Sequence, residues 1–195
     1  MAERKIKRVV VFGGSFSPPT LAHVEIIRRC LALPDVDEVW LVPSGNRTDK
    51  QISVSPGDQL AMLKLVMQDE YNNDKRLKLV DIELRRGIAT ETYDTYQEFL
   101  AQHPNTDFWF VFGSDSYATI RTWLNGDWLA QNLPVLLVER NGHALPPAAA
   151  HIRHLAPLPG RIAPISSTLV RAKLKAHEDI RQLVPGPVAD YVEGG

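Results

Sequence analysis

Cysteine is nearly absent from this chain of 195 residues, which contains one, so no internal disulfide can form. Histidine and cysteine also do not cluster with the spacing of a zinc site, and we expect no metal held by protein side chains. The single Cys30 lies between Ile27 and Leu31 in an apolar helical pattern. We therefore expect Cys30 to be a small buried side chain rather than a nucleophile.

The chain also lacks an excess of either charge, with 22 Lys and Arg against 23 Asp and Glu and a formal net charge of −1. That balance argues against nucleic acid or a membrane surface as the partner, because such binders normally carry a basic excess. Apolar runs long enough to cross a membrane are missing, and the charged start "MAERKIKR" has no cleavage signature after it. We expect a cytoplasmic protein without a signal peptide.

Short apolar runs alternate with helical patterns along most of the sequence, and a hydrophobic share of 44% suits a folded core. This alternation predicts an α/β protein with a mostly parallel sheet and helices on both faces. The length suits a single domain over 1–195, with a C-terminal helical segment at about 166–195. The Ala/Pro-rich section 143–166 is irregular, with a short strand around "IRHLAP". We predict strands at 8–13, 37–43, 77–84, 107–113 and 134–140, and helices at 21–33, 55–70, 92–103, 116–123 and 167–179.

A parallel sheet of this kind binds ligands beyond the carboxyl ends of its strands, where the strand order reverses. Each predicted strand is followed by a polar or glycine-rich segment: "GGSFSPPTLAH", "PSGNRTDK", "ELRRGIATET", "GSDSY" and "ERNGH". These five segments are the candidate ligand-binding loops.

The first of them, residues 13–23, has features of a phosphate site. Gly13 and Gly14 allow backbone amides to approach a ligand closely, and we expect Ser17 to cap the following helix. Thr20 and His23 are three residues apart, so on a helix they would face the same bound anion. The plainer alternative is a tight turn followed by a polar residue near a helix end.

Three motifs resemble the nucleotidylyltransferase superfamily. "GGSFSPPTLAH" is similar to its G-G-[ST]-F-x-P-x-[HT]-x-G-H signature, and "ISSTLVR" (165–171) to its late phosphate-binding segment. "GSDSYATIRTW" (113–123) resembles a stretch of bacterial nicotinate-mononucleotide adenylyltransferases. The motifs keep the family order from about Val9 to about Leu174. The resemblance implies a Rossmann-like, doubly wound fold.

It also implies an activity: the AMP moiety of ATP is transferred to nicotinate mononucleotide or nicotinamide mononucleotide, with release of pyrophosphate, in NAD biosynthesis. Mg²⁺ would arrive on the ATP phosphates, and a homo-oligomer would be ordinary for the family. The implied catalytic residues are His23, Thr20, Lys50 and Arg171. The implied ATP and phosphate contacts are Gly13, Gly14, Ser15, Phe16, Asp115, Ile165, Ser166, Ser167 and Thr168, and those for the mononucleotide are Thr92, Trp123 and Arg47.

The chain departs from the family pattern at several positions, with Ala22 in place of the signature glycine, Gln59 where many relatives have arginine, and Glu91 where a tyrosine is usual. A carboxylate at position 91 suits a neutral nicotinamide better than an acidic nicotinate. Trp128 also competes with Trp123 for the pyridine ring. Three alternatives remain: phosphopantetheine adenylylation, cytidylyl transfer to an alcohol phosphate, and a nucleotide-binding sensor without turnover.

Overall fold

The computed structural model describes residues 6–45, 54–140 and 142–194. Its strands are β1 (Lys7–Gly14), β2 (Glu38–Pro43), β3 (Leu77–Leu79), β4 (Thr106–Gly113), β5 (Val135–Val138) and β6 (Ile152–His154). Its helices are α1 (Leu21–Leu31), α2 (Pro56–Tyr71), α3 (Ile82–Arg86), α4 (Thr92–Gln102), α5 (Ser114–Tyr117), the 3₁₀ turn η1 (Ile120–Thr122), α6 (Gly126–Asn132), α7 (Ser167–Lys175) and α8 (Gly186–Glu193).

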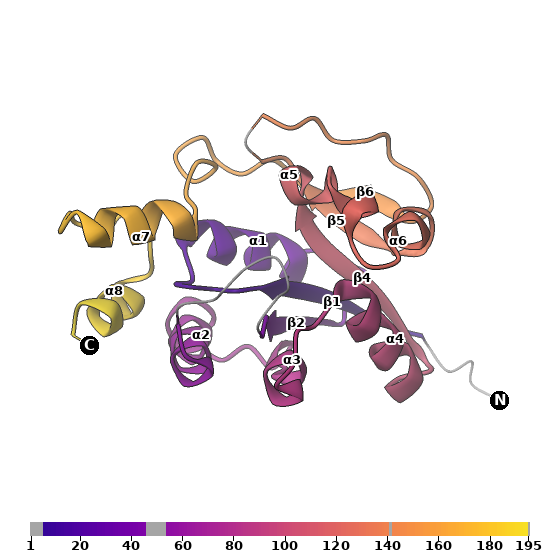
Figure 1. Cartoon of the computed structure of the whole chain (residues 1–195), viewed down its shortest axis with the longest axis horizontal. Coiled ribbons are helices and arrows are strands. Elements are labelled where there is room, and N and C mark those ends of the chain that lie inside the picture. The colour runs from indigo at the N-terminus through magenta and orange to yellow at the C-terminus, as the bar shows by residue number, and fades with distance from the viewer. Residues whose placement is uncertain (1–5, 46–53, 141, 195) are drawn as a thin grey trace.

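The strands form one sheet in the order β3-β2-β1-β4-β5-β6, and every pairing is parallel (Figure 1). This confirms the predicted doubly wound α/β fold. The chain moves outward in one direction from β1 to β3 and in the other from β4 to β6. The order therefore reverses between β1 and β4, and a ligand site is expected beyond their carboxyl ends.

Alternate residues of β1 face opposite sides of the sheet, as strand geometry requires. Val10 and Phe12 belong to an apolar cluster with α1 and part of α2, whereas Val9 and Val11 pack with α3, α4 and α6. Both faces of the central strand are thus buried, which explains its nearly continuous apolar run. Cys30 is fully buried in the first cluster, as predicted.

The C-terminal helices α7 and α8 lie at one end of the molecule, beside α1 and α2 (Figure 1). A third apolar cluster joins these four helices through side chains that include Val24, Val66, Val170 and Val188. The backbone N–H of Leu21 also donates to the Leu183 carbonyl over 2.9 Å. The start of α1, where the signature loop ends, is therefore supported by the last part of the described chain.

Several predicted elements differ from the structure: the helix expected at 167–179 ends at Lys175, and the strand expected at 134–140 ends at Val138. The strand expected at 77–84 ends at Leu79. The backbone leaves the extended conformation at Asp81, and α3 begins at Ile82. The helix ends before Gly87, which is in a left-handed conformation (φ 66°). The helix expected at 116–123 is divided into α5 and η1. The short strand expected around "IRHLAP" is present as β6.

Over residues 6–45, 54–140 and 142–194, no helix is long and apolar enough to cross a membrane.

Candidate active site

The glycine pair ends β1 at the point where the strand order reverses. A methyl group built on Gly13 would come no closer than 3.8 Å to the Val42 carbonyl, and one on Gly14 no closer than 3.5 Å to the Phe16 ring. These are ordinary van der Waals contacts, so the packing of the protein itself does not require glycine at either position. The close approach of a ligand does supply a reason for glycine here.

Phe16 holds the loop after the glycines in an unusual conformation. Its φ is 42°, in the left-handed region that a bulky residue rarely adopts. The side chain is 1% exposed and packs edge-on against Phe12 and His23, with ring centroids 5.4 and 5.1 Å apart. This buried contact compensates for the backbone strain, and such strain is typical of functional loops.

Helix α1 begins at a capping box made by Thr20 and His23. Thr20 is the N-cap, which corrects the expectation that Ser17 caps the helix; the Ser17 hydroxyl is buried without a partner in the described structure. The Thr20 N–H donates to His23 Nδ1 over 2.9 Å, and the Thr20 hydroxyl lies 2.9 Å from the same nitrogen. Thr20 is fully buried, whereas His23 is partly exposed, so the imidazole is the more accessible member of the pair.

The capping box fixes the tautomer of His23. A nitrogen that accepts a backbone N–H cannot carry a proton, so the proton of the neutral ring is on Nε2. Burial, together with the charge of Arg140, lowers the pKa of His23 from 6.5 to about 3. At neutral pH the side chain is therefore a neutral Nε2–H donor.

His23 opens into a cavity between the carboxyl ends of β1, β4 and β5. Gly13, Asp115 and Arg140 line it together with His23. Arg140 Nη2 donates to the Ile165 carbonyl over 2.9 Å, while its Nε is buried without a partner in the described structure. A methyl group on Gly113 would lie 2.4 Å from an Asp115 oxygen and 2.9 Å from Arg140 Cγ, so a side chain at this position would require both of these side chains to move. The neutral donor of His23, the cation of Arg140 and the acidic residue Asp115 therefore line the same cavity.

The late segment 165–171 is bonded directly to the signature loop. Ser166 caps α7 by accepting the Leu169 N–H over 3.2 Å. Ser167 Oγ donates to the Pro18 carbonyl over 2.8 Å, and Arg171 Nη1 donates to the Ser17 carbonyl over 2.6 Å. Thr168 is exposed at the start of α7 and accepts from Arg171 Nη2 over 3.2 Å. The structure therefore brings together two motifs that are about 150 residues apart in the sequence, and it places the first turn of α7 beside the loop.

A second cavity lies on the other side of Gly13 and is lined by Gly14, Thr92 and Trp123. The Trp123 ring packs edge-on against Phe112 at 5.2 Å between centroids, and its Nε1–H donates to Thr119 Oγ1 over 3.1 Å. Trp128 packs instead against Tyr93 and Tyr96. Of the two tryptophans that competed for a ring-binding role, Trp123 is the one that lines this cavity.

The wall of the second cavity contains a polar network centred on Glu83. Its carboxylate accepts from Thr90 Oγ1 over 3.0 Å and from Thr95 Oγ1 over 2.8 Å, and Arg86 donates to Thr95 Oγ1 over 3.0 Å. Glu91, the N-cap of α4, also lines the cavity. Two acidic residues therefore line the same cavity as Thr92 and Trp123.

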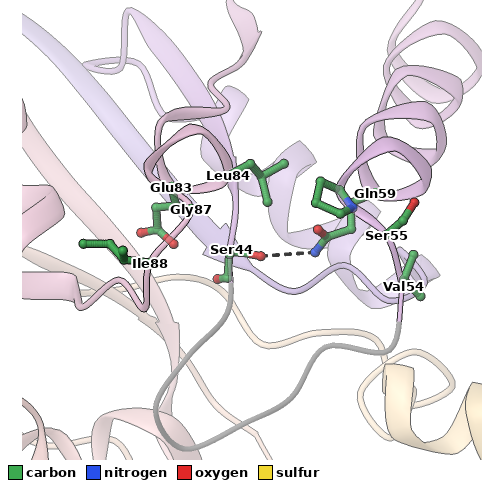
Figure 2. Close-up of a pocket in the computed structure, with 10 residues that line it drawn as sticks. Ser44, Val54, Ser55, Gln59, Glu83, Leu84, Gly87 and Ile88 are labelled. Atoms are coloured by element: carbon green, nitrogen blue, oxygen red, sulfur yellow. Dashed lines mark hydrogen bonds between the residues drawn. The ribbon is translucent and has the colours of Figure 1, made fainter.

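A third cavity follows the end of β2, and Figure 2 shows Ser44 between α2 and α3, with the Gln59 amide directed at its carbonyl. Ser44 and Glu83 line both this cavity and the second one, so the two adjoin. Arg47, which the family resemblance implies as a mononucleotide contact, and Lys50, which it implies as a catalytic residue, lie outside the described residues.

Three residues of this region are missing from the set suggested by the sequence: Arg140, Ser44 and Glu83. Ser44 follows a predicted strand, whereas Glu83 and Arg140 fall at the ends of the strands predicted at 77–84 and 134–140. All three belong to segments that the sequence marks as polar, so the position along the chain was a usable signal. What singles out each residue is a contact made across the fold, for example the bond from Arg140 to Ile165, 25 residues away.

Comparison with known proteins identifies the family. The cytidylyltransferase-like family model matches residues 11–173. A protein of Salinibacter ruber named probable nicotinate-nucleotide adenylyltransferase is 32% identical, covering 95% of this chain and 94% of its own. One of the same name from Symbiobacterium thermophilum is 33% identical, covering 95% and 92%.

A solved structure of Plasmodium falciparum nicotinic acid mononucleotide adenylyltransferase complexed with NaAD superposes with a TM-score of 0.85. Its sequence is 25% identical, and the match covers 96% of this chain and 95% of that one. The sequence match extends over both the signature loop and the late segment that contacts it. The chain belongs to the cytidylyltransferase-like family.

Proposed function

We propose that this protein is a nicotinate-nucleotide adenylyltransferase. The observation that carries the proposal is the position of Gly13, which lines two adjoining cavities at the switch point of the sheet. One cavity has the donor, cation and carboxylate suited to ATP, and the other has an aromatic ring suited to a pyridine. Relatives at about a third identity over nearly their whole length are named for this activity.

The reaction joins two phosphates at the glycine pair. A phosphate oxygen of the mononucleotide attacks the α-phosphorus of ATP, and the bond between that phosphorus and the α,β-bridging oxygen breaks. Pyrophosphate leaves with the bonding electron pair, and the dinucleotide remains. Chemistry of this kind depends on positioning and on the stabilisation of charge rather than on a protein nucleophile.

His23 is the proposed electrostatic catalyst. Its Nε2–H would donate to phosphate oxygens of ATP and stabilise the charge that develops on the leaving pyrophosphate. Thr20 would act as a positioning residue, because it occupies Nδ1 and is itself buried. Arg140 adds a cation to the same cavity, and Asp115 would accept the ribose hydroxyls of the adenosine.

The start of α7 is the proposed site for the outer phosphates. Ser167 and Arg171 hold α7 against the loop, and the exposed Thr168 and the first-turn N–H groups remain for the β- and γ-phosphates. Gly14, Ser15 and Phe16 would offer backbone contacts to the reacting phosphates. We propose that Ile165 and Ser166 shape this end of the cavity, through the bond to Arg140 and the helix cap.

Thr92 and Trp123 are the proposed mononucleotide contacts. The indole would pack against the pyridine ring, and the first turn of α4, which starts at Thr92, would present N–H groups to the substituent on that ring. Arg47 and Lys50 stay predictions as further mononucleotide and phosphate ligands.

Mg²⁺ is the proposed companion of ATP. Across the described part of the chain, no three His, Cys, Asp or Glu side chains gather to hold a metal, and Asp115 is the one carboxylate lining the ATP cavity. The ion would therefore be held mainly by phosphate oxygens and water, where it neutralises phosphate charge.

The experiment is an assay of pyrophosphate release by the purified protein with ATP and Mg²⁺. Nicotinate mononucleotide, nicotinamide mononucleotide and phosphopantetheine are supplied in separate reactions, with CTP in place of ATP as a further arm. We expect release and dinucleotide formation with ATP and nicotinate mononucleotide. No release with either pyridine mononucleotide would refute the proposal, and faster turnover with nicotinamide mononucleotide would identify the amide as the preferred acceptor.

A further inference from the structure

Gln59 lies in the first turns of α2 and is 1% exposed, although its side chain is polar. A buried amide is costly unless its hydrogen-bonding groups find partners, so the contacts of such a residue are informative. Figure 2 shows the Gln59 side chain reaching from α2 toward Ser44 at the end of β2.

The Gln59 amide joins two loops of the candidate active site. Its Nε2 donates to the Ser15 carbonyl over 2.7 Å and to the Ser44 carbonyl over 3.2 Å. Ser15 belongs to the signature loop after β1, and Ser44 follows β2. A backbone bond from the Ser44 N–H to the Gly14 carbonyl, 2.8 Å long, runs beside them. One NH₂ group therefore supplies both of its hydrogens to carbonyl oxygens of adjacent loops.

The bond to Ser15 also fixes the direction of the next amide. In a trans peptide the C=O and N–H point in opposite directions. When the Ser15 carbonyl turns toward α2, the N–H of Phe16 turns away from α2. The backbone of Phe16 is in the left-handed region at φ 42°. This conformation is unfavourable for a bulky residue, so the surrounding contacts have to stabilise it.

We infer that Gln59 is a positioning residue for nucleotidyl transfer: it holds the Ser15 carbonyl and thereby aims the Phe16 N–H at the reacting phosphates. The inference rests on the proposed function, and adds to it a residue that touches neither substrate. Its contribution is to keep one backbone donor aligned with charge that develops in the transition state, and a small misalignment of such a donor is costly.

Gln59→Met tests the inference, because methionine keeps the length and burial of the side chain but donates no hydrogen bond. We expect kcat to fall about 30-fold, with KM for ATP and for nicotinate mononucleotide changed less than about threefold. Gln59→Arg restores several N–H donors and can extend into the adjoining cavity. We expect it to recover kcat to within about fivefold of the wild type. Gln68→Met, an exposed glutamine of the same helix, is the matched control and should change neither kcat nor the melting temperature.

A second measurement does not depend on turnover. In a ¹H–¹⁵N spectrum, α,β-methylene ATP should shift the Phe16 amide strongly in the wild type and weakly in Gln59→Met. If Gln59→Met melts earlier but keeps wild-type kcat and the wild-type Phe16 shift, Gln59 is a packing residue and the inference is wrong. If the wild type itself releases no pyrophosphate, the proposed function fails, and the amide shifts alone then decide whether Gln59 aims Phe16.

Discussion

The backbone N–H of Thr20 donates to Nδ1 of His23 over 2.9 Å, so the first residue of the capping box decides which ring nitrogen faces the cavity as a donor. The protein obtains a helix cap and a defined tautomer from one contact. Because Thr20 is fully buried, water does not compete for this contact. Several tests of the site depend on it.

Replacing His23 by alanine removes the Nε2–H while leaving the helix. We expect kcat to fall about 10²- to 10³-fold, the usual effect of losing one preorganised donor to a developing charge. Loss of the capping box should cost about 1 kcal/mol of unfolding free energy. Steady-state kinetics and urea unfolding measure the two effects, and near-normal turnover in a folded variant would remove His23 from the mechanism.

His23 should also make stability depend on pH. The folded protein has the pKa lowered to about 3, whereas the unfolded chain takes up a proton near 6.5. The stabilisation is therefore complete above pH 6.5 and declines as the pH falls toward 3, by at most about 1.4 kcal/mol per pH unit. Between pH 7 and 5.5 the wild type should lose about 1 kcal/mol more than His23→Gln. Parallel curves from urea unfolding of the two proteins would contradict the assigned neutral state.

Gly13→Ala should separate ligand approach from protein stability. An added methyl group meets nothing in the protein closer than 3.8 Å, so we expect a melting temperature within about 2 °C of the wild type. Since Gly13 lines both cavities, kcat/KM should fall at least about tenfold.

Gly126→Ala is the matched control for Gly13→Ala. The added methyl group would lie 2.3 Å from the Ile120 carbonyl, and we expect a loss of about 2 kcal/mol of unfolding free energy or more. A Gly13→Ala variant that keeps full activity would show that the ligand does not approach this glycine.

Trp123→Ala should raise KM for the mononucleotide about tenfold and leave KM for ATP nearly unchanged, because a ring stacked on a base contributes about 1–3 kcal/mol. Trp128→Ala is the control, since that ring packs on Tyr93 and Tyr96. Initial rates with one substrate varied at a time give both constants. An unchanged mononucleotide KM in Trp123→Ala would assign the pyridine contact to another side chain.

The central fold followed from sequence because strong, short-range signals specify it. The run "VVVF" has to be buried on both faces, and Ser55 followed by Pro56 marks the start of α2, where Ser55 indeed accepts the Asp58 N–H. The segment 77–84 misled because its alternation is too short to distinguish a strand from a strand followed by a helical turn.

The cap of α1 was misassigned for a reason that is visible in the sequence. Proline disfavours the helical conformation in the residue before it, so Pro19 keeps Pro18 out of the helix, and Ser17 cannot cap a helix that starts at Pro18. Thr20, the first residue after the prolines that can cap, has His23 three positions later and forms the capping box. Arg140 and Glu83 could not be assigned from the sequence in this way, because their hydrogen-bond partners lie in other segments and come together only in the folded protein.

The bonds from Ser167 to Pro18 and from Arg171 to Ser17 also determine when the site can exist. The bonded residues are 149 and 154 positions apart. At ribosomal rates of about 5–20 residues per second, the second half of each pair is made roughly 7–30 s after the first. During synthesis the signature loop therefore lacks its hydrogen bonds to Ser167 and Arg171 until α7 has been made. A nascent chain that ends before α7 should fail to retain ATP, so nucleotide binding should depend on synthesis having passed α7.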